Sequence, residues 1–240
     1  MTAHHGAAAE TLALASALYR DLGNHNGYAN ALSEMSVVNE MAGDYSAAIA
    51  NLTQALELQI GPENLLAQAN VLCRLGAVHR ASGNHTAAMD NLNLALALYR
   101  DHGNQSDRAN ALSQIGFVQL VTGHYVEAAE SFARALDLCR LAGNPNGEAE
   151  VLNNIGELML ATNRIAQART DHESALGIAI SADLLLEQAR ALEGIGTSHL
   201  REGKEAKAKA ALRKALAKYR QAGSPRAALV ESTLDQLGVD

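Results

Sequence analysis

The stretch from Arg108 to Gly147, RANALSQIGFVQLVTGHYVEAAESFARALDLCRLAGNPNG, decides the fold because the rest of the chain repeats it every 40 residues. Leucine fills one column of the repeat, at Leu32, Leu72, Leu112, Leu152 and Leu192. Glycine fills a second, at Gly76, Gly116, Gly156 and Gly196, and alanine a third, at Ala48, Ala88, Ala128, Ala168 and Ala208. A period this regular predicts a stacked array of repeats rather than one central core.

Each repeat is predicted to be a pair of helices. Gly116 would lie on the first helix and Ala128 on the second, where small side chains let two helix backbones approach closely. Gly123 falls where the first helix must stop, since glycine accepts the left-handed conformation at a helix C-terminus. Only three prolines in the chain agree with an all-helical fold.

We therefore predict one all-α domain over residues 1–240, a right-handed superhelical α-solenoid of about 12 antiparallel helices. Full repeats span residues 27–65, 66–106, 107–146, 147–186 and 187–224, with half-units at 7–22 and 225–237. First helices should begin near Gly27, Leu66, Asp107, Gly147 and Glu187. Second helices should begin near Tyr45, His85, Tyr125, Ile165 and Glu205.

Leu112-x2-Ile115-Gly116-x2-Gln119 followed by Ala128-x3-Phe132 resembles the tetratricopeptide pattern W-x2-L-G-x2-Y and A-x3-F. The aromatic columns are replaced, and Arg140 stands where the shorter unit ends in proline. The longer unit is similar to the 40-residue class of bacterial signalling and transcriptional regulators with C-terminal repeats, Rap-type proteins, kinesin light chains and Leu-Gly-Asn polarity proteins. The resemblance implies a groove, lined by first helices, that binds a protein or peptide.

Composition narrows the class of partner. A formal charge of −7 argues against general binding to nucleic acid or to an anionic membrane. No apolar run approaches the roughly 20 residues that span a bilayer. Two cysteines, Cys73 and Cys139, fit a reducing compartment, so we expect a cytoplasmic protein.

The groove positions carried over from the motif fall at repeated offsets from the leucine column. We predict a peptide-binding groove formed by Asn30, Asn70, Asn110, Ser113, Phe117, Leu120, Glu150, Asn153, Glu157, Leu160, Arg190 and Glu193. The three asparagines would form a ladder of amides that donate to and accept from a peptide backbone. The glutamates favour a ligand with a basic group. The alternative is that these asparagines make only local contacts.

A second surface is basic. Residues 201–226 hold nine basic and two acidic side chains, a net +7, so the rest of the chain carries −14 against a total of −7. Lys204, Lys207, Lys214 and Lys218 form this predicted secondary surface. Two interpretations remain open: a solvated face, and a docking site for an acidic partner or for nucleic-acid phosphate.

No phosphate loop, nucleophile elbow or kinase signature occurs, and His79 and His85 lack a third ligand for zinc. We expect no catalysis, cofactor or metal. The sequence predicts a protein- or peptide-binding scaffold, the sensory or assembly module of a bacterial regulatory protein. The alternative is an oligomerisation module that stacks head-to-tail through its half-unit ends.

Overall fold

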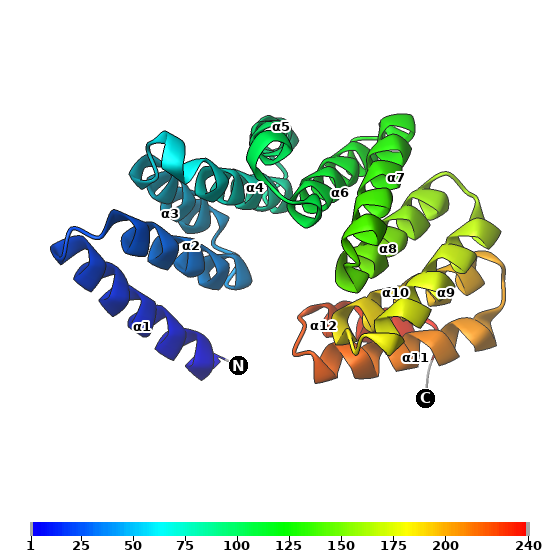
Figure 1. Cartoon of the computed structure of the whole chain (residues 1–240). Helices are drawn as coiled ribbons and strands as arrows, with labels where there is room; N and C mark the ends of the chain where they lie inside the picture. Colours follow the sequence, from blue (N-terminus) through cyan, green and yellow to red (C-terminus); the bar gives the residue numbers. More distant parts are fainter. Residues whose placement is uncertain (1, 239–240) are drawn as a thin grey trace. The chain divides into compact units, whose positions relative to one another are not determined.

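The computed structural model describes the backbone of residues 2–238 and the side chains of residues 9–238. This part of the chain is all helix, with one short 3-10 turn and no strand (Figure 1). The helices are α1 (Thr2–Asp21), α2 (His25–Met41), α3 (Tyr45–Leu58), α4 (Leu65–Ala81), α5 (His85–His102), α6 (Gln105–Val121), α7 (Tyr125–Ala142), α8 (Pro145–Ala161), α9 (Ile165–Ser181), α10 (Leu185–Arg201), α11 (Glu205–Gln221) and α12 (Arg226–Gln236). The all-α solenoid fold and the expected twelve helices are confirmed.

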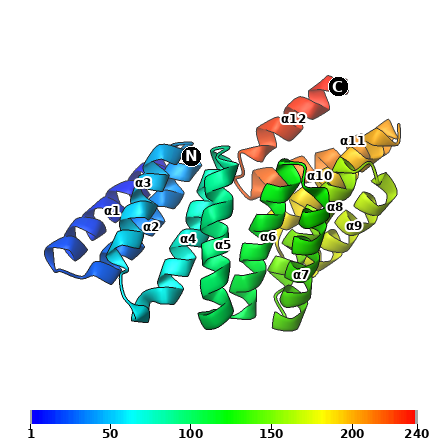
Figure 2. The same ribbon diagram turned by 90° about the horizontal axis from the view of Figure 1, so that it is seen from above.

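The chain divides into two compact units, residues 1–118 and 119–240. In the first unit, α1 to α5 lie side by side in chain order, each antiparallel to the one before it (Figure 2). In the second unit, α7 to α12 follow one another in the same way, and α10 also contacts α8. Within both units, therefore, each helix packs on its neighbours in the sequence.

The second helices begin where the sequence predicted, at Tyr45, His85, Tyr125, Ile165 and Glu205. The first helices begin one or two residues early because an asparagine caps three of them. Asn24 Oδ1 accepts a hydrogen bond from the backbone N–H of Gly27 at 2.9 Å, and Asn144 does the same for Gly147 at 3.0 Å. A helix starts directly after its cap, so α2 begins at His25 and α8 at Pro145.

Turns between paired helices need one residue with positive φ. Gly123 supplies it between α6 and α7, with φ of 82°, and Asn163 takes the same place between α8 and α9, with φ of 59°. The linker after α3 differs from the others. There Pro62 starts a 3-10 turn, Pro62–Asn64, which the sequence analysis did not predict.

The core consists of small and large side chains that alternate along each second helix. On α5, Ala88, Leu92 and Ala95 are fully buried and Tyr99 is 3% exposed. They pack against Leu72 and Ala69 of α4 on one side and against residues of α6 on the other. Each second helix in the middle of a unit is thus covered by two first helices. None of the helices in residues 2–238 combines the length and apolar character needed to cross a bilayer.

Candidate functional site

The amide ladder, Asn30, Asn70 and Asn110, lies wholly in the first unit, on the successive first helices α2, α4 and α6. All three side chains are exposed. Side chains at one offset of a repeated helix project in the same sense, so the ladder presents amides at matching positions on three helices. Each amide can donate to a carbonyl and accept from an N–H of an extended chain.

Tyr99 fixes the middle amide. Its hydroxyl donates to Asn70 Oδ1 at 2.7 Å. Burial, followed by the nearby Cys73 and Asp107, raises the pKa of Tyr99, which therefore stays a neutral donor. With its oxygen engaged by Tyr99, Asn70 has its NH2 group left to donate to a ligand carbonyl. Asn110 Nδ2 makes a long contact, 3.8 Å, with Cys73 Sγ.

Beside the ladder, Arg80 covers Phe117. The Arg80 guanidinium lies 4.7 Å from the centroid of the Phe117 ring, and Arg80 Nε donates to Gln114 Oε1 at 3.2 Å. Phe117 is partly exposed, so α4 and α6 together present a flat, partly apolar platform. Arg80 stands at the same groove-facing offset from the leucine column as Leu120, whereas Gln114 was not predicted.

Four predicted groove residues are buried: Ser113, Leu120, Asn153 and Leu160. At Leu160 the backbone is engaged as well, since its carbonyl oxygen accepts a hydrogen bond from Arg201 at 2.7 Å. In the second unit Leu120 and Leu160 are each 8% exposed, so neither offers an open apolar surface. The signal for Ser113 and Asn153 was present in the sequence, because their column also holds the small, buried Cys73.

Asn153 sits at the centre of a buried polar cluster in the second unit. Its Nδ2 donates to Glu187 Oε2 at 2.9 Å and to the Glu187 carbonyl at 3.2 Å. Its Oδ1 lies 3.1 Å from Nδ1 of His172, which must carry the proton of this bond. Asn153 is fully buried and Glu187 is 8% exposed. Sequence reasoning missed Glu187, because a glutamate at a helix start normally faces water.

Arg190 neutralises this cluster. It donates to Asn154 Oδ1 at 2.6 Å, to Glu157 Oε1 at 3.1 Å and to Glu187 Oε2 at 3.3 Å. Burial lowers the pKa of Arg190, but the carboxylates of Glu187 and Glu157 outweigh it and raise the pKa. Arg190 is therefore a permanent cation, and three of its partners come from α8 and α10.

Glu193 is also committed to contacts within the chain. It accepts a hydrogen bond from the Tyr219 hydroxyl at 2.7 Å and binds the Arg226 guanidinium with distances of 2.9 and 3.2 Å. Glu150 is partly exposed on α8. Of these predicted groove glutamates, Glu157 is thus bonded to Arg190 and Glu193 to Arg226, and Arg226 was not among the predicted groove residues.

The ring of His172 leaves no room for a side chain at Gly156 or Gly194 of the second unit. A Cβ at residue 156 would lie 2.5 Å from His172 Nε2, and one at residue 194 would overlap the same ring. Burial, assisted by the charge of Arg190, lowers the pKa of His172 to about 4. The ring is consequently neutral at physiological pH.

The lysines of α11 and of the residue before it, Lys204, fall into two groups. Lys204 pairs with Glu202 at 2.8 Å and Lys209 pairs with Glu205 at 2.7 Å. The hydrogen bond from Lys204, followed by one from Arg169, lowers the pKa of Glu202 to about 2 despite partial desolvation. Lys207 and Lys214 are exposed and Lys218 is partly exposed. These three lie at helical spacing along one stripe.

Cys73 and Cys139 are buried thiols. Burial, followed by Glu150 and Glu148, raises the pKa of Cys139 to about 11, so it is a poor nucleophile. Within residues 2–238, no three His, Cys, Asp or Glu side chains gather as ligands for a metal ion.

Two family models, both described as tetratricopeptide repeat, match residues 69–102 and 107–181. No curated protein sequence matches the chain. Among solved structures, BtubC (BKLC) from P. vanneervenii is similar with a TM-score of 0.70 and 18% identity, covering 91% of both chains. Aspartyl phosphate phosphatase F from Bacillus subtilis is similar with a TM-score of 0.73 and 18% identity, covering 92% of this chain and 58% of that one.

The Rap conjugation gene regulator of the plasmid pLS20, solved with the Phr* peptide, has a TM-score of 0.74 and 12% identity over 87% of this chain and 56% of its own. The chain thus spans little more than half the length of these last two proteins. At such identities the likeness is one of fold. The two family matches show that residues 69–102 and 107–181 are tetratricopeptide repeats, and the 40-residue columns and paired helices continue the same pattern on either side of them.

Proposed function

We propose that the chain is a non-catalytic scaffold that binds an extended peptide along the exposed side of α2, α4 and α6. The observation that carries this proposal is the amide ladder: three exposed asparagines on three first helices, with Asn70 fixed by the hydroxyl of a buried tyrosine. Two proteins of the same fold are described as complexes, one with the competence and sporulation factor and one with the Phr* peptide. By analogy, the scaffold would be the sensory or assembly module of a bacterial regulator in the cytoplasm.

The ligand chemistry follows from the side chains that reach the surface. Asparagine amides recognise a peptide backbone whatever its sequence, and the Arg80–Phe117 platform favours an apolar or aromatic side chain next to it. On the first helices of the second unit, Glu150, Glu157 and Glu193 outnumber Arg190 among the predicted groove residues. They favour a basic group on the part of the ligand that reaches them.

A peptide-display library selected on the intact chain tests this proposal. Selected peptides are synthesised and their affinities measured by fluorescence anisotropy. Changing Asn70 and Asn110 together to Ala should weaken binding at least ~10-fold, since several hydrogen bonds to the ligand are lost. Asn93→Ala, an exposed asparagine on the second helix α5, is the matched control and should change nothing. Equal affinity for all three proteins would show that the ladder is not the binding site.

Head-to-tail stacking of copies through the half-unit ends finds less support. The exposed residues of α12 are largely polar and include Glu231, Ser232 and Asp235, and Glu231 pairs with Arg220 of α11 at 2.6 Å. A polar surface of this kind offers little apolar area on which a second copy could stack. We therefore expect sedimentation velocity to give one species across a wide concentration range. Growth with concentration would favour the assembly role instead.

A further inference from the structure

The first helix of the structure carries the packing column of a second helix. Leu12, Ala15 and Tyr19 stand two repeat lengths before Leu92, Ala95 and Tyr99 of α5. In α5 these residues lie between the first helices α4 and α6. In α1 only the later neighbour, α2, is present, and it contacts the tyrosine closely: a Cβ at Gly27 would lie 2.5 Å from the Tyr19 ring.

The exposed fractions of side chains on α1 can be compared with those of their equivalents on other second helices, which a preceding first helix covers. Tyr19 is 37% exposed, whereas Tyr99 and Tyr219 at the same repeat position are 3% and 2% exposed. Leu18 is 59% exposed, while its counterpart Leu98 packs against the core around α5. Leu12 is partly exposed where Leu52 and Leu92 are fully buried. The surface formed by Leu12, Ala15, Leu18 and Tyr19 is called the α1 face below.

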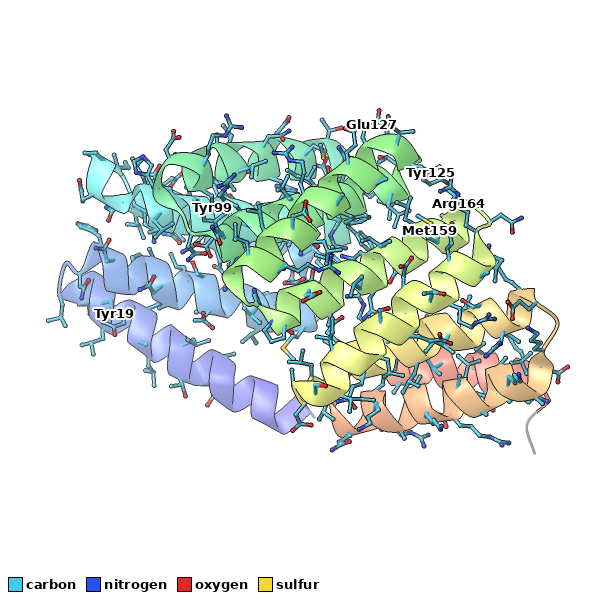
Figure 3. All side chains as sticks on the ribbon, turned by 45° about the vertical axis from the view of Figure 1, so that its right-hand side comes forward. Tyr19, Tyr99, Tyr125, Glu127, Met159 and Arg164 are labelled. Carbon is cyan, nitrogen blue, oxygen red and sulfur yellow. The ribbon has the colours of Figure 1, made fainter. Side chains whose placement is uncertain are left out.

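The two buried tyrosines also show what kind of neighbour fits. Tyr99 donates its hydroxyl to Asn70 of α4, and Tyr219 donates to Glu193 of α10; in both cases the acceptor lies on the preceding first helix. Small residues of that helix, such as Ala69 and Gly76, let it approach the second helix closely. Tyr19 presents the same hydroxyl from an exposed ring (Figure 3).

We propose that the α1 face is a docking site for an amphipathic helix of the first-helix type. The occupant has alanine or glycine along one stripe, a leucine that packs beside Leu12, and an amide or carboxylate oxygen that accepts from the Tyr19 hydroxyl. This site is distinct from the amide ladder and does not depend on it. The exposed residues of α12 are largely polar and do not match the occupant's chemistry.

The chain itself provides the test ligand. The probe is a fluorescein-labelled, end-capped peptide with the sequence of α4, residues 65–81, carrying Cys73→Ser to prevent oxidation. Binding to the intact chain is followed by fluorescence anisotropy. Leu12→Asp should reduce the affinity at least ~10-fold, because it buries a carboxylate against the apolar stripe of the probe. Leu94→Asp, which changes an equally apolar leucine exposed on α5, is the matched control and should have no effect.

A double-mutant cycle tests the hydrogen bond without disturbing the fold. Tyr19→Phe in the protein and Asn70→Ala in the peptide should each weaken binding about five-fold, the value of one hydrogen bond, and the pair no more than either alone. Independent, additive losses would overturn the predicted geometry. The proposal also fails if the probe does not bind, or if it binds Leu12→Asp as tightly as wild type. Self-association of the chain that Leu12→Asp abolishes would assign the face to a second copy.

Discussion

His172 occupies a column in which the other repeats carry a leucine or a phenylalanine, and burial holds its ring neutral with a pKa of about 4. In the unfolded chain the pKa returns to about 6.5. Between these values the unfolded state binds more protons than the folded state, so stability is highest above pH 6.5 and falls as the pH drops towards 4. We expect this residue alone to remove on the order of 2–3 kcal/mol over that range.

His172→Leu separates this effect from other titrations. Leucine fills the same column in three other repeats, so the ring is replaced by a side chain that the fold accepts. The variant should lose about 1–2 kcal/mol at neutral pH, since Asn153 Oδ1 is left without its partner. Its urea-unfolding free energy should then fall less steeply than that of wild type from about pH 7.5 to about pH 5. Parallel slopes would mean that His172 is not the titrating group.

Tyr99 is expected to act as a positioning residue for Asn70. Tyr99→Phe keeps the buried ring and removes only the hydroxyl, so stability should fall by about 1 kcal/mol. Affinity for a ladder-bound peptide should also fall, because Asn70 is no longer held in one orientation. Asn93→Ala, on the exposed side of α5 and outside the ladder, is the control. Equal peptide affinities for the two variants would assign Tyr99 a purely structural role.

At the scale of single residues, the columns predicted which positions share a face but not how deep each one lies. Asn30, Asn70 and Asn110 came out exposed, whereas Asn153 is fully buried with Glu187 and His172. That cluster depends on three polar side chains brought together from α8, α9 and α10. The spacing of residues along one helix does not predict contacts between side chains from three different helices. Arg74 and Arg226 were missed for the same reason, since each bonds across to a neighbouring first helix.

At the scale of helices, two glycines in consecutive helices should respond oppositely to alanine. Gly156 of α8 faces the His172 ring, so Gly156→Ala forces the ring to move and should cost about 1–3 kcal/mol. Gly177 lies inside α9 with open space around its Cα. Gly177→Ala should stabilise the chain by about 0.5–1 kcal/mol, because alanine loses less backbone entropy in a helix. Thermal unfolding of the two variants measures whether each substitution raises or lowers stability. A stabilising Gly156→Ala would contradict the packing described for α8 and α9.

The stripe of α11 formed by Lys207, Lys214 and Lys218 should bind acidic chains by charge alone. We propose that a labelled oligoglutamate peptide binds wild type, that added salt weakens the binding, and that changing these three lysines to Gln abolishes it. Changing Lys204 and Lys209 instead should matter less, since Glu202 and Glu205 already pair with them. Undiminished binding by the triple variant would leave α11 as a solvated face.

Helix boundaries were predicted well where the sequence contains a residue that starts or ends helices. The second helices begin at the predicted residues. The early starts of α2 and α8 follow from caps by Asn24 and Asn144, which the sequence analysis did not use. The start of α1 at Thr2, ahead of the predicted Ala7, has no such marker. The 3-10 turn at Pro62 depends on the linker length between α3 and α4 rather than on the repeat pattern.

At the scale of the whole molecule, a repeat array distributes stability through contacts between neighbours. The columns predicted this architecture because each one serves the same contact in every repeat. The division into residues 1–118 and 119–240 could not be predicted from the repeat columns, because they run through both units with the same spacing. The prediction of a single domain over the whole chain stays a prediction.

The two terminal helices should differ in how often they open. Each packs on one end of its unit, but α12 buries Val230 and Leu234 and is held by the Arg226–Glu193 and Arg220–Glu231 pairs. In α1, Leu14, Leu18 and Tyr19 remain exposed. Local opening costs less free energy where less apolar surface is buried, so amide hydrogens of α1 should exchange faster than those of α12.

Hydrogen exchange followed by mass spectrometry measures this difference, and it also links the array to the proposed docking site. Adding the α4 peptide should slow exchange in α1, because a bound helix must be released before α1 can open. Exchange in α12 provides the internal control and should not change. Protection that spreads evenly over both ends would mean that the peptide binds elsewhere, and slow exchange in α1 without any peptide would mean that the α1 face is already covered.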